Sequence, residues 1–260
     1  MSCARRWTAW RPNEGWLRRA ATAGLELLLP RHCVACATRL PDTQSALACG
    51  HCWSRLPHLP LPQCERCGYP LPEGECRWCP LLPAYVRCVR SVCWVPDGVA
   101  GELVHALKYH GWWRLSDELA LRMARLSWPA DVIADRVALV PVPLSRRREQ
   151  ERGFNQSERL AAAIAPHWKR PVWSDVLVRT TFTSSQTRLT PEQRLHNVAG
   201  AFGVVAHGAR IRDAHLMLVD DVVTTAATLN ACAAALFAGG ARLISYVTFG
   251  RARLPGDEPV

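Results

Sequence analysis

Eight cysteines near the start of the sequence form four pairs, each with two residues between its members. The pairs, in chain order, are Cys33/Cys36, Cys49/Cys52, Cys64/Cys67 and Cys76/Cys79. A Cys-x-x-Cys turn points two thiolates at one place, and two such turns complete a tetrahedral zinc site. Eight ligands therefore predict two Cys₄ zinc sites. Such closed sites leave no position for water, so we expect their role to be structural.

The pairing of these turns is open at the level of sequence. Sequential pairing, the first pair with the second and the third with the fourth, is the simplest arrangement and is typical of tandem zinc ribbons. A crossed pairing has the same spacing, and disulfides or a redox relay are the competing chemistries. Zinc is favoured because a segment of about 40 to 50 residues rarely builds a sufficient core without a metal or a crosslink.

A second stretch whose residue types could bind a ligand joins two carboxylates to a threonine-rich turn. An apolar strand is predicted over 216–219, and it leads into Asp220 and Asp221. Open α/β sheets bind ligands at the carboxyl ends of their strands. The N–H groups of a following helix, with the hydroxyls of Thr224 and Thr225, suit a phosphate, and the paired carboxylates suit the vicinal hydroxyls of a ribose. The plainer alternative is an ordinary helix cap.

Elements that alternate between strand and helix are predicted to position these residues. Strands are expected over 89–95, 137–142, 216–219 and 243–249. Helices are expected from a cap at Asp97 through 107, over 157–165, from 190 onward and over 225–238. This alternation predicts a parallel α/β sheet. We therefore divide the chain into a basic N-terminal segment (1–31), a double zinc ribbon (32–80) and an α/β domain (88–251).

Charge and composition narrow the class of partner. The chain has 32 Lys and Arg against 22 Asp and Glu, a net charge of +10, and 49% hydrophobic residues. This composition excludes a disordered chain. The positive field favours anionic partners such as phosphates, nucleotides or nucleic acid, although plain solubility is the competing explanation. The run Arg146, Arg147 and Arg148 fits pyrophosphate, a nucleic-acid backbone or a solvated loop.

The sequence also indicates a compartment. No apolar run approaches the ~20 residues that a membrane span needs. The apolar stretch over 20–30 is interrupted by Glu26 and lacks a small-residue cleavage site, so it is a poor signal peptide. We therefore expect a protein without a membrane span in the cytoplasm, where thiols stay reduced and clustered cysteines bind metal.

Several other residues have both a structural and a functional interpretation. Lys108 is expected to complement the dipole at the end of a helix, although a phosphate contact is conceivable there. Trp112 and Trp113 fit packing better than base stacking. The unpaired cysteines are expected to be small buried hydrophobes; they are Cys3, Cys88, Cys93 and Cys232.

Residues 219–229 resemble the phosphoribosyl pyrophosphate (PRPP) loop of the type I phosphoribosyltransferases. The chain from 33 to 251 resembles the ComF family of competence proteins, whose members join zinc ribbons to a phosphoribosyltransferase-like domain. Three stretches carry the resemblance besides the cysteines, in the family's order. They are Val140-Pro141-Val142-Pro143 with Arg152-Gly153-Phe154-Asn155-Gln156, then Ser185-Gln186-Thr187 with Arg194, Asn197 and Gly200-Ala201-Phe202, and the PRPP loop.

The resemblance implies a role for each matching residue. Asp220 and Asp221 would hold the ribose hydroxyls and act as the catalytic pair, with Mg²⁺ accompanying PRPP. The 5′-phosphate would be wrapped by Thr224, Thr225, Ala226, Ala227 and Thr228. Arg152 and Gly153 match a loop that contacts pyrophosphate, and 183–197 matches a segment that closes over the site. The family's link to DNA uptake in natural transformation implies single-stranded DNA and competence-machinery proteins as partners.

Two functions of different classes follow. The first is an enzyme that transfers a phosphoribosyl group and releases pyrophosphate. The second is a non-catalytic zinc adaptor that senses PRPP or a nucleotide and docks protein or single-stranded DNA. The family usually has glycine where this chain has Ala226. If that residue has a positive φ, we expect Ala226→Gly to tighten PRPP binding by up to about tenfold, from ~1.4 kcal/mol of relieved strain.

Overall fold

A computed structural model describes residues 31–41, 46–71, 76–96, 98–109, 112–180, 201–205 and 210–254 of the chain. Some of the predictions lie outside these residues. They are the basic segment over 1–30, Cys3, the cap at Asp97, the helix start at 190 and the segment 183–197. The fold and the site are built from the described residues alone.

A four-stranded parallel sheet forms the centre of the fold, in the order β1-β6-β5-β2. Its strands are β1 (Val86–Val95), β2 (Arg136–Pro141), β5 (His215–Val223) and β6 (Leu243–Ala252). All four were expected from sequence; β1, β5 and β6 are longer than the pattern indicated, and β2 has the expected length but begins and ends one residue earlier. β1 begins inside the stretch between the last cysteine pair and Cys88. The parallel α/β architecture is therefore confirmed.

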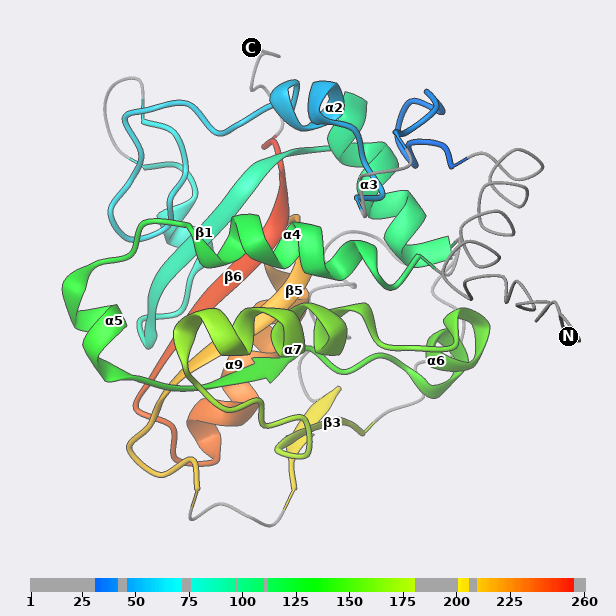
Figure 1. Cartoon of the computed structure of the whole chain (residues 1–260). Helices are drawn as coiled ribbons and strands as arrows, with labels where there is room; N and C mark the ends of the chain where they lie inside the picture. The colour runs from blue at the N-terminus through cyan, green and yellow to red at the C-terminus, as the bar shows by residue number, and fades with distance from the viewer. Residues whose placement is uncertain are drawn as a thin grey trace, which may run out of the picture.

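Helices cover both faces of this sheet (Figure 1). One face holds α3 (Gly98–Tyr109), α4 (Leu115–Ala124) and α7 (Gln156–Trp168), and the other holds α9 (Ala227–Ala238). The side chains of β5 alternate between the layers: Met217 and Val219 pack with the first group, whereas Leu216 and Leu218 pack with α9. Because both faces are buried, the strand is a continuous apolar run.

Two short helices flank β2. They are α5 (Ala130–Asp135) before it and α6 (Arg146–Arg152) after it. The sequence interpretation of 146–148 as a charged loop or patch missed α6. Its N-terminus is capped because the backbone N–H of Arg148 donates to Ser145 Oγ over 3.3 Å, and Gly153 ends it at φ 78°. A separate antiparallel pair consists of β3 (Leu177–Arg179) and β4 (Phe202–Val204).

The cysteine-rich segment is not an isolated module. It contains α2 (Gly50–Ser54) and the short 3₁₀ helix η1 (Cys79–Leu81). Its first half packs with α3 and α4, and its second half packs with the layer that holds α9. Glu118 of α4 accepts hydrogen bonds from the Leu47 backbone N–H (2.5 Å) and from Trp53 Nε1 (3.1 Å). The core of the ribbons is thus continuous with the core of the sheet.

Candidate functional site

Two cysteine tetrads form in the ribbon segment. We call Cys33, Cys36, Cys49 and Cys52 the first tetrad, and Cys64, Cys67, Cys76 and Cys79 the second tetrad. Within each, the four sulfurs lie within 4.8 Å of one another. This grouping follows the sequential pairing predicted from sequence, and it leaves no crossed ligand set.

The sulfur geometry fits zinc. The contacts across the pairs are 3.7 Å for Cys33–Cys52 and Cys36–Cys49, 3.4 Å for Cys64–Cys79 and 3.2 Å for Cys67–Cys76. A tetrahedral Zn–S₄ site with bonds of about 2.3 Å needs sulfurs about 3.8 Å apart. The two tetrads therefore support two zinc sites, each with four thiolate ligands and no open position.

The acidic pair lies within the last part of β5, not in the turn after it. Both side chains are buried, Asp220 being 9% and Asp221 4% exposed. Ser157 of α7 donates its hydroxyl to Asp220 Oδ1 over 2.7 Å, and the backbone N–H of Asp221 donates to the same oxygen over 2.9 Å. Burial, and then the adjacent Asp221, raise the pKa of Asp220 to about 8.

The second carboxylate has a cationic partner. Asp221 Oδ2 lies 2.6 Å from Lys108 Nζ, in an ion pair whose side chains are 6% and 22% exposed. Lys108 stands in the last turn of α3, so it complements the helix dipole as expected, but it also reaches the carboxyl edge of the sheet. The sequence interpretation missed this pairing and the contact of Ser157.

The turn after β5 leads directly into α9. Thr224 and Thr225 are exposed, whereas Ala226 is buried and has a left-handed backbone, φ 60° and ψ 5°. Ala226 offers no side-chain cap to the helix, which begins at Ala227, two residues later than predicted. Thr228, in the first turn, is also exposed. Uncapped N–H groups at a helix N-terminus, beside exposed hydroxyls, are suited to an anion.

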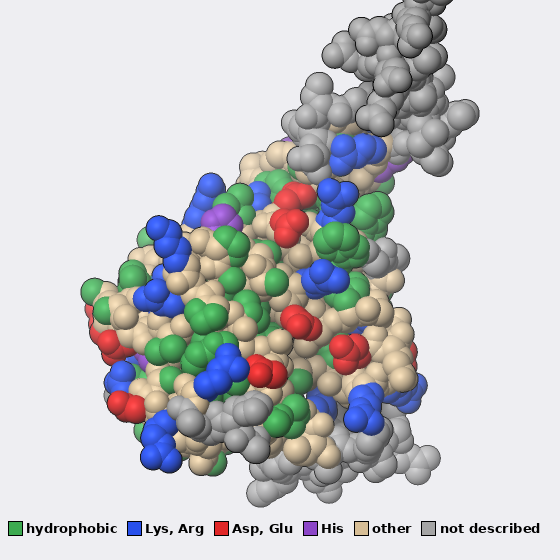
Figure 2. Space-filling model, turned by 60° about the horizontal axis from the view of Figure 1, so that its bottom comes forward, with side chains coloured by type: hydrophobic (Ala, Val, Ile, Leu, Met, Phe, Trp, Pro, Cys, Tyr) green, Lys and Arg blue, Asp and Glu red, His purple; other side chains and the backbone are tan. Residues whose placement is uncertain are grey.

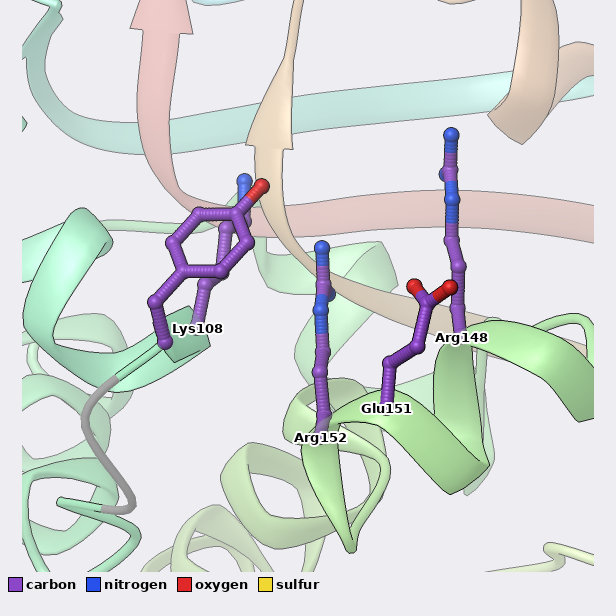
Figure 3. Close-up of a pocket in the computed structure, with 5 residues that line it drawn as sticks. Lys108, Arg148, Glu151 and Arg152 are labelled. Carbon is purple, nitrogen blue, oxygen red and sulfur yellow. The ribbon is translucent and has the colours of Figure 1, made fainter.

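A polar cavity of about 370 Å³ is connected to the acidic pair through Lys108, the ion-pair partner of Asp221. It is lined by Lys108 and Tyr109 of α3 and by Arg148, Glu151 and Arg152 of α6. The side chains of Arg148 and Arg152 extend in the same direction from α6, and Lys108 lies across from them on α3 (Figure 3). Three cations and one carboxylate give this cavity a net positive charge that suits an anionic group.

Arg152 is held by its neighbours at the edge of this cavity. Its Nη1 donates to Gln156 Oε1 over 2.9 Å, and its guanidinium lies 5.3 Å from the Tyr109 ring centroid. Gly153 ends α6 with a positive φ and has open space around it. The structure thus brings Asp221, Lys108 and Arg152 into one region. The residues 224–228 are not among those that line the cavity.

Basic side chains are not gathered into one broad patch on the face shown in Figure 2. Lys and Arg side chains are there interspersed with Asp and Glu. Trp112 and Trp113 are exposed by 43% and 45%, and Arg159 stacks 5.0 Å from the Trp113 ring. Neither tryptophan therefore lies in the core, although Trp113 packs against Arg159. Cys88, Cys93 and Cys232 are buried, as expected for small hydrophobes.

Comparison with known proteins identifies the family. Residues 24–82 match the double zinc ribbon domain family. The DNA utilization protein YhgH of Escherichia coli K12 is 31% identical over 237 residues, which cover 84% of this chain and 96% of that protein. Competence protein ComFC of Bacillus subtilis is 28% identical over 200 residues (74% of this chain and 78% of the relative). Competence protein F of Haemophilus influenzae is 32% identical over 93 residues, 36% of this chain and 41% of the relative. The chain belongs to the ComF family.

Membership in the ComF family confirms the family resemblance of the sequence. Among solved structures, a hypoxanthine phosphoribosyl transferase of Trypanosoma cruzi is similar at 20% identity over 59% of this chain and 71% of that chain. Its TM-score of 0.33 is too low to carry an argument. In the part of this ComF-family chain that the structure describes, no helix is long and apolar enough to cross a membrane.

Proposed function

We propose that this ComF-family protein binds PRPP with Mg²⁺ at the carboxyl end of β5. The observation that supports this most is the buried pair Asp220–Asp221 in the last part of β5, which leads into a turn with exposed hydroxyls and an uncapped helix N-terminus. Carboxylates suit ribose hydroxyls and Mg²⁺, and the helix N-terminus suits phosphate. PRPP carries a ribose and phosphates, the groups that these two neighbouring features accept.

The parts of PRPP would be distributed over the site as follows. Asp220 and Asp221 take the ribose hydroxyls and supply oxygen ligands for Mg²⁺, which neutralises part of the pyrophosphate charge. The turn and the start of α9 take the 5′-phosphate through Thr224, Thr225, Ala226, Ala227 and Thr228. Lys108 and Arg152 face the pyrophosphate from the cavity of about 370 Å³. Lys108 is an addition to the residues chosen from sequence.

The enzymatic form of this proposal is phosphoribosyl transfer. The bond between ribose C1′ and the pyrophosphate oxygen breaks, a bond from C1′ to an acceptor nucleophile forms, and pyrophosphate leaves. Lys108 and Arg152 stabilise the charge that develops on the leaving pyrophosphate. The alternative is a site that binds PRPP or a nucleotide without turnover. Pyrophosphate release in the presence of candidate nucleobases distinguishes the two, because only the enzyme releases it.

Binding itself is tested by thermal unfolding of the full, zinc-loaded chain. Mg²⁺-PRPP at about 100 times its Kd should raise the free energy of unfolding by about 2.7 kcal/mol, because it binds the folded state alone. Ribose 5-phosphate and pyrophosphate each occupy part of the site and should give smaller shifts. Equal shifts for Mg²⁺-PRPP and Mg²⁺-pyrophosphate would count against a ribose-binding acidic pair.

The cellular role that we propose is in DNA utilization in the cytoplasm. The relatives are named for DNA utilization and competence, and reduced cysteine tetrads suit a cytoplasmic protein. The cations and exposed aromatic rings around Tyr109, Trp112 and Trp113 suit weak binding of single-stranded DNA without sequence preference. Affinity for an oligonucleotide should then fall steeply between low and moderate salt. If the oligonucleotide does not bind at low salt, DNA is not a direct partner of the protein.

The pH dependence of PRPP binding should report Asp220. Its pKa of about 8 means that the carboxyl is mostly protonated at pH 7 in the free protein. Mg²⁺ and ribose hydroxyls favour the ionised form, so affinity should rise from pH 6 and level off above about pH 8. The hydrogen bond from Ser157 lowers this pKa, so Ser157→Ala should move the midpoint to higher pH.

Calorimetric titration of both proteins across pH 6 to 9 measures this shift. Titration of the PRPP phosphates affects both proteins equally, so the difference between the two profiles belongs to the protein. Superimposable profiles would show that another group controls the pH dependence.

Ala226→Gly should affect stability more than affinity. The structure gives Ala226 the positive φ on which the tenfold expectation depended. If the turn keeps this backbone with and without ligand, the strain lowers the stability of both states and cancels in the affinity. The left-handed backbone destabilises the folded state of an alanine by about 1–2 kcal/mol. Burial of its methyl group stabilises the folded state by about 0.8 kcal/mol. We therefore expect a gain of less than about 1 kcal/mol in unfolding free energy and a change in PRPP affinity within about threefold.

Chemical denaturation and calorimetry of the same Ala226→Gly sample separate these effects. A tenfold gain in affinity at unchanged stability would mean that the free turn adopts a different, relaxed backbone.

A further inference from the structure

Arg251 is a buried cation that needs a compensating negative charge. Its side chain is fully buried near the end of β6, where it pairs in register with Val223 of β5 and Trp94 of β1. Within the described part of the chain, none of its three guanidinium nitrogens has a hydrogen-bond partner. An isolated buried charge is strongly unfavourable, so native proteins rarely keep one without compensation.

The surroundings of Arg251 belong to the second tetrad. Its guanidinium carbon lies 4.4 Å from the Trp78 ring centroid and 5.7 Å from that of Tyr69. Trp78 stands between Cys76 and Cys79, and the Tyr69 backbone N–H donates to Cys67 Sγ over 3.4 Å. Burial lowers the pKa of Arg251 to about 10, whereas the charges of Cys67 and Cys76 act in the opposite direction. Arg90, a like charge, also faces it.

The second tetrad can supply compensating charge to Arg251 when it holds zinc. Zn²⁺ with four thiolates carries a net charge of −2, and groups around the ligands stabilise such centres. The first tetrad differs, because its Cys36 is exposed and water can screen its charge. In the second tetrad no cysteine is exposed, and Cys67 is fully buried. A buried cation beside Cys67 is therefore suited to the second centre.

We propose that Arg251 is the counter-ion of the zinc–thiolate centre at the second tetrad. It is a positioning residue that acts through the thiolates. It balances their negative charge in the buried interior and connects the ribbon to the end of β6. The aromatic rings of Trp78 and Tyr69 keep the guanidinium in place by cation–π contact. This role is independent of whether the chain binds PRPP.

Zinc release from the full chain tests the proposal. In Arg251→Met, at least one of the two zinc equivalents should pass to a chelator at least tenfold faster than in the wild type. Arg251→Lys keeps the charge and should stay within about threefold of the wild type. Arg136→Met is the matched control, because Arg136 stacks 4.2 Å from Trp168, has two unpartnered nitrogens and lies on the far edge strand.

The conservative variant separates a charge role from simple packing. Arg251→Lys keeps the charge but lacks the planar group, so a charge role predicts zinc release close to the wild-type rate. A packing role predicts that Arg251→Lys releases zinc as fast as Arg251→Met. Wild-type release of both zinc equivalents in Arg251→Met overturns the proposal. If Arg251→Met does not fold, the proposal is overturned instead when Arg251→Lys releases zinc at least tenfold faster than the wild type.

Discussion

Removal of zinc should unfold most of the chain and not the ribbons alone. The first half of the cysteine-rich segment shares a core with α3 and α4, and the second half shares one with α9. Structural zinc contributes about 10–16 kcal/mol of apparent binding free energy in small zinc peptides, which equals the whole stability of a typical domain, about 5–15 kcal/mol. We expect close to two zinc ions per chain and a cooperative loss of helical signal after chelation, measured by metal analysis and circular dichroism.

A pair of cysteine variants provides the control for zinc removal. Cys64→Ser removes a ligand of the second tetrad and should reproduce the effect of the chelator. Cys88→Ala removes a buried cysteine that belongs to neither tetrad, and it should cost only a small cavity. A chelated chain that keeps its wild-type melting temperature would show that the sheet does not depend on the ribbons.

Asp221→Asn should weaken the binding of Mg²⁺-PRPP by at least about a hundredfold, a loss of about 2.7 kcal/mol. The carboxylate is 4% exposed, so water replaces its charge poorly, and its partner Lys108 is left without an anion. Asp220→Asn should have a comparable effect on binding at pH 8 and above, where the wild-type carboxyl is ionised. The fold should survive because asparagine has nearly the same shape, and at pH 7 the pKa of about 8 already makes Asp220 mostly neutral.

The matched control for the acidic pair is Asp175→Asn. Asp175 is an exposed carboxylate that forms an ion pair with Arg210 over 3.2 Å. Neither residue belongs to the proposed site. Its replacement changes the net charge by the same amount and should leave PRPP affinity within about twofold, because exposed pairs contribute little. Unchanged affinity in both Asp220→Asn and Asp221→Asn would remove the acidic pair from the site.

The parts of the fold that sequence predicts are those with a strong local pattern. Paired cysteines have a fixed spacing, so their tetrads can be predicted with only the pairing left open. Leu216 to Val219 form a continuous apolar run, and the Ala-rich stretch before Gly239 is a clear helix. α6 lacks such a pattern because none of its residues is buried. Only two residues in the sequence indicate this helix: Ser145 as its N-cap and Gly153 at its C-terminal end.

The contacts of the site could not be predicted in the same way, since they join distant segments. Lys108 meets Asp221 because β6 is inserted between β1 and β5, which sets where the end of α3 lies. Ser157 reaches Asp220 only because α7 packs on β5. Arg251 follows the apolar run over 243–249 and looks like an ordinary surface residue in the sequence. Its burial depends on the ribbon that folds over the sheet end.

A crystal structure of the full, zinc-loaded chain with PRPP and Mg²⁺ tests the central claim most directly. We predict density for the ribose and the metal at Asp220 and Asp221, for the 5′-phosphate over the turn that ends at Thr228, and for the pyrophosphate facing Lys108 and Arg152. A ligand bound elsewhere on the basic surface, or no ligand at a concentration that saturates other PRPP-binding proteins, would contradict the assignment of this site.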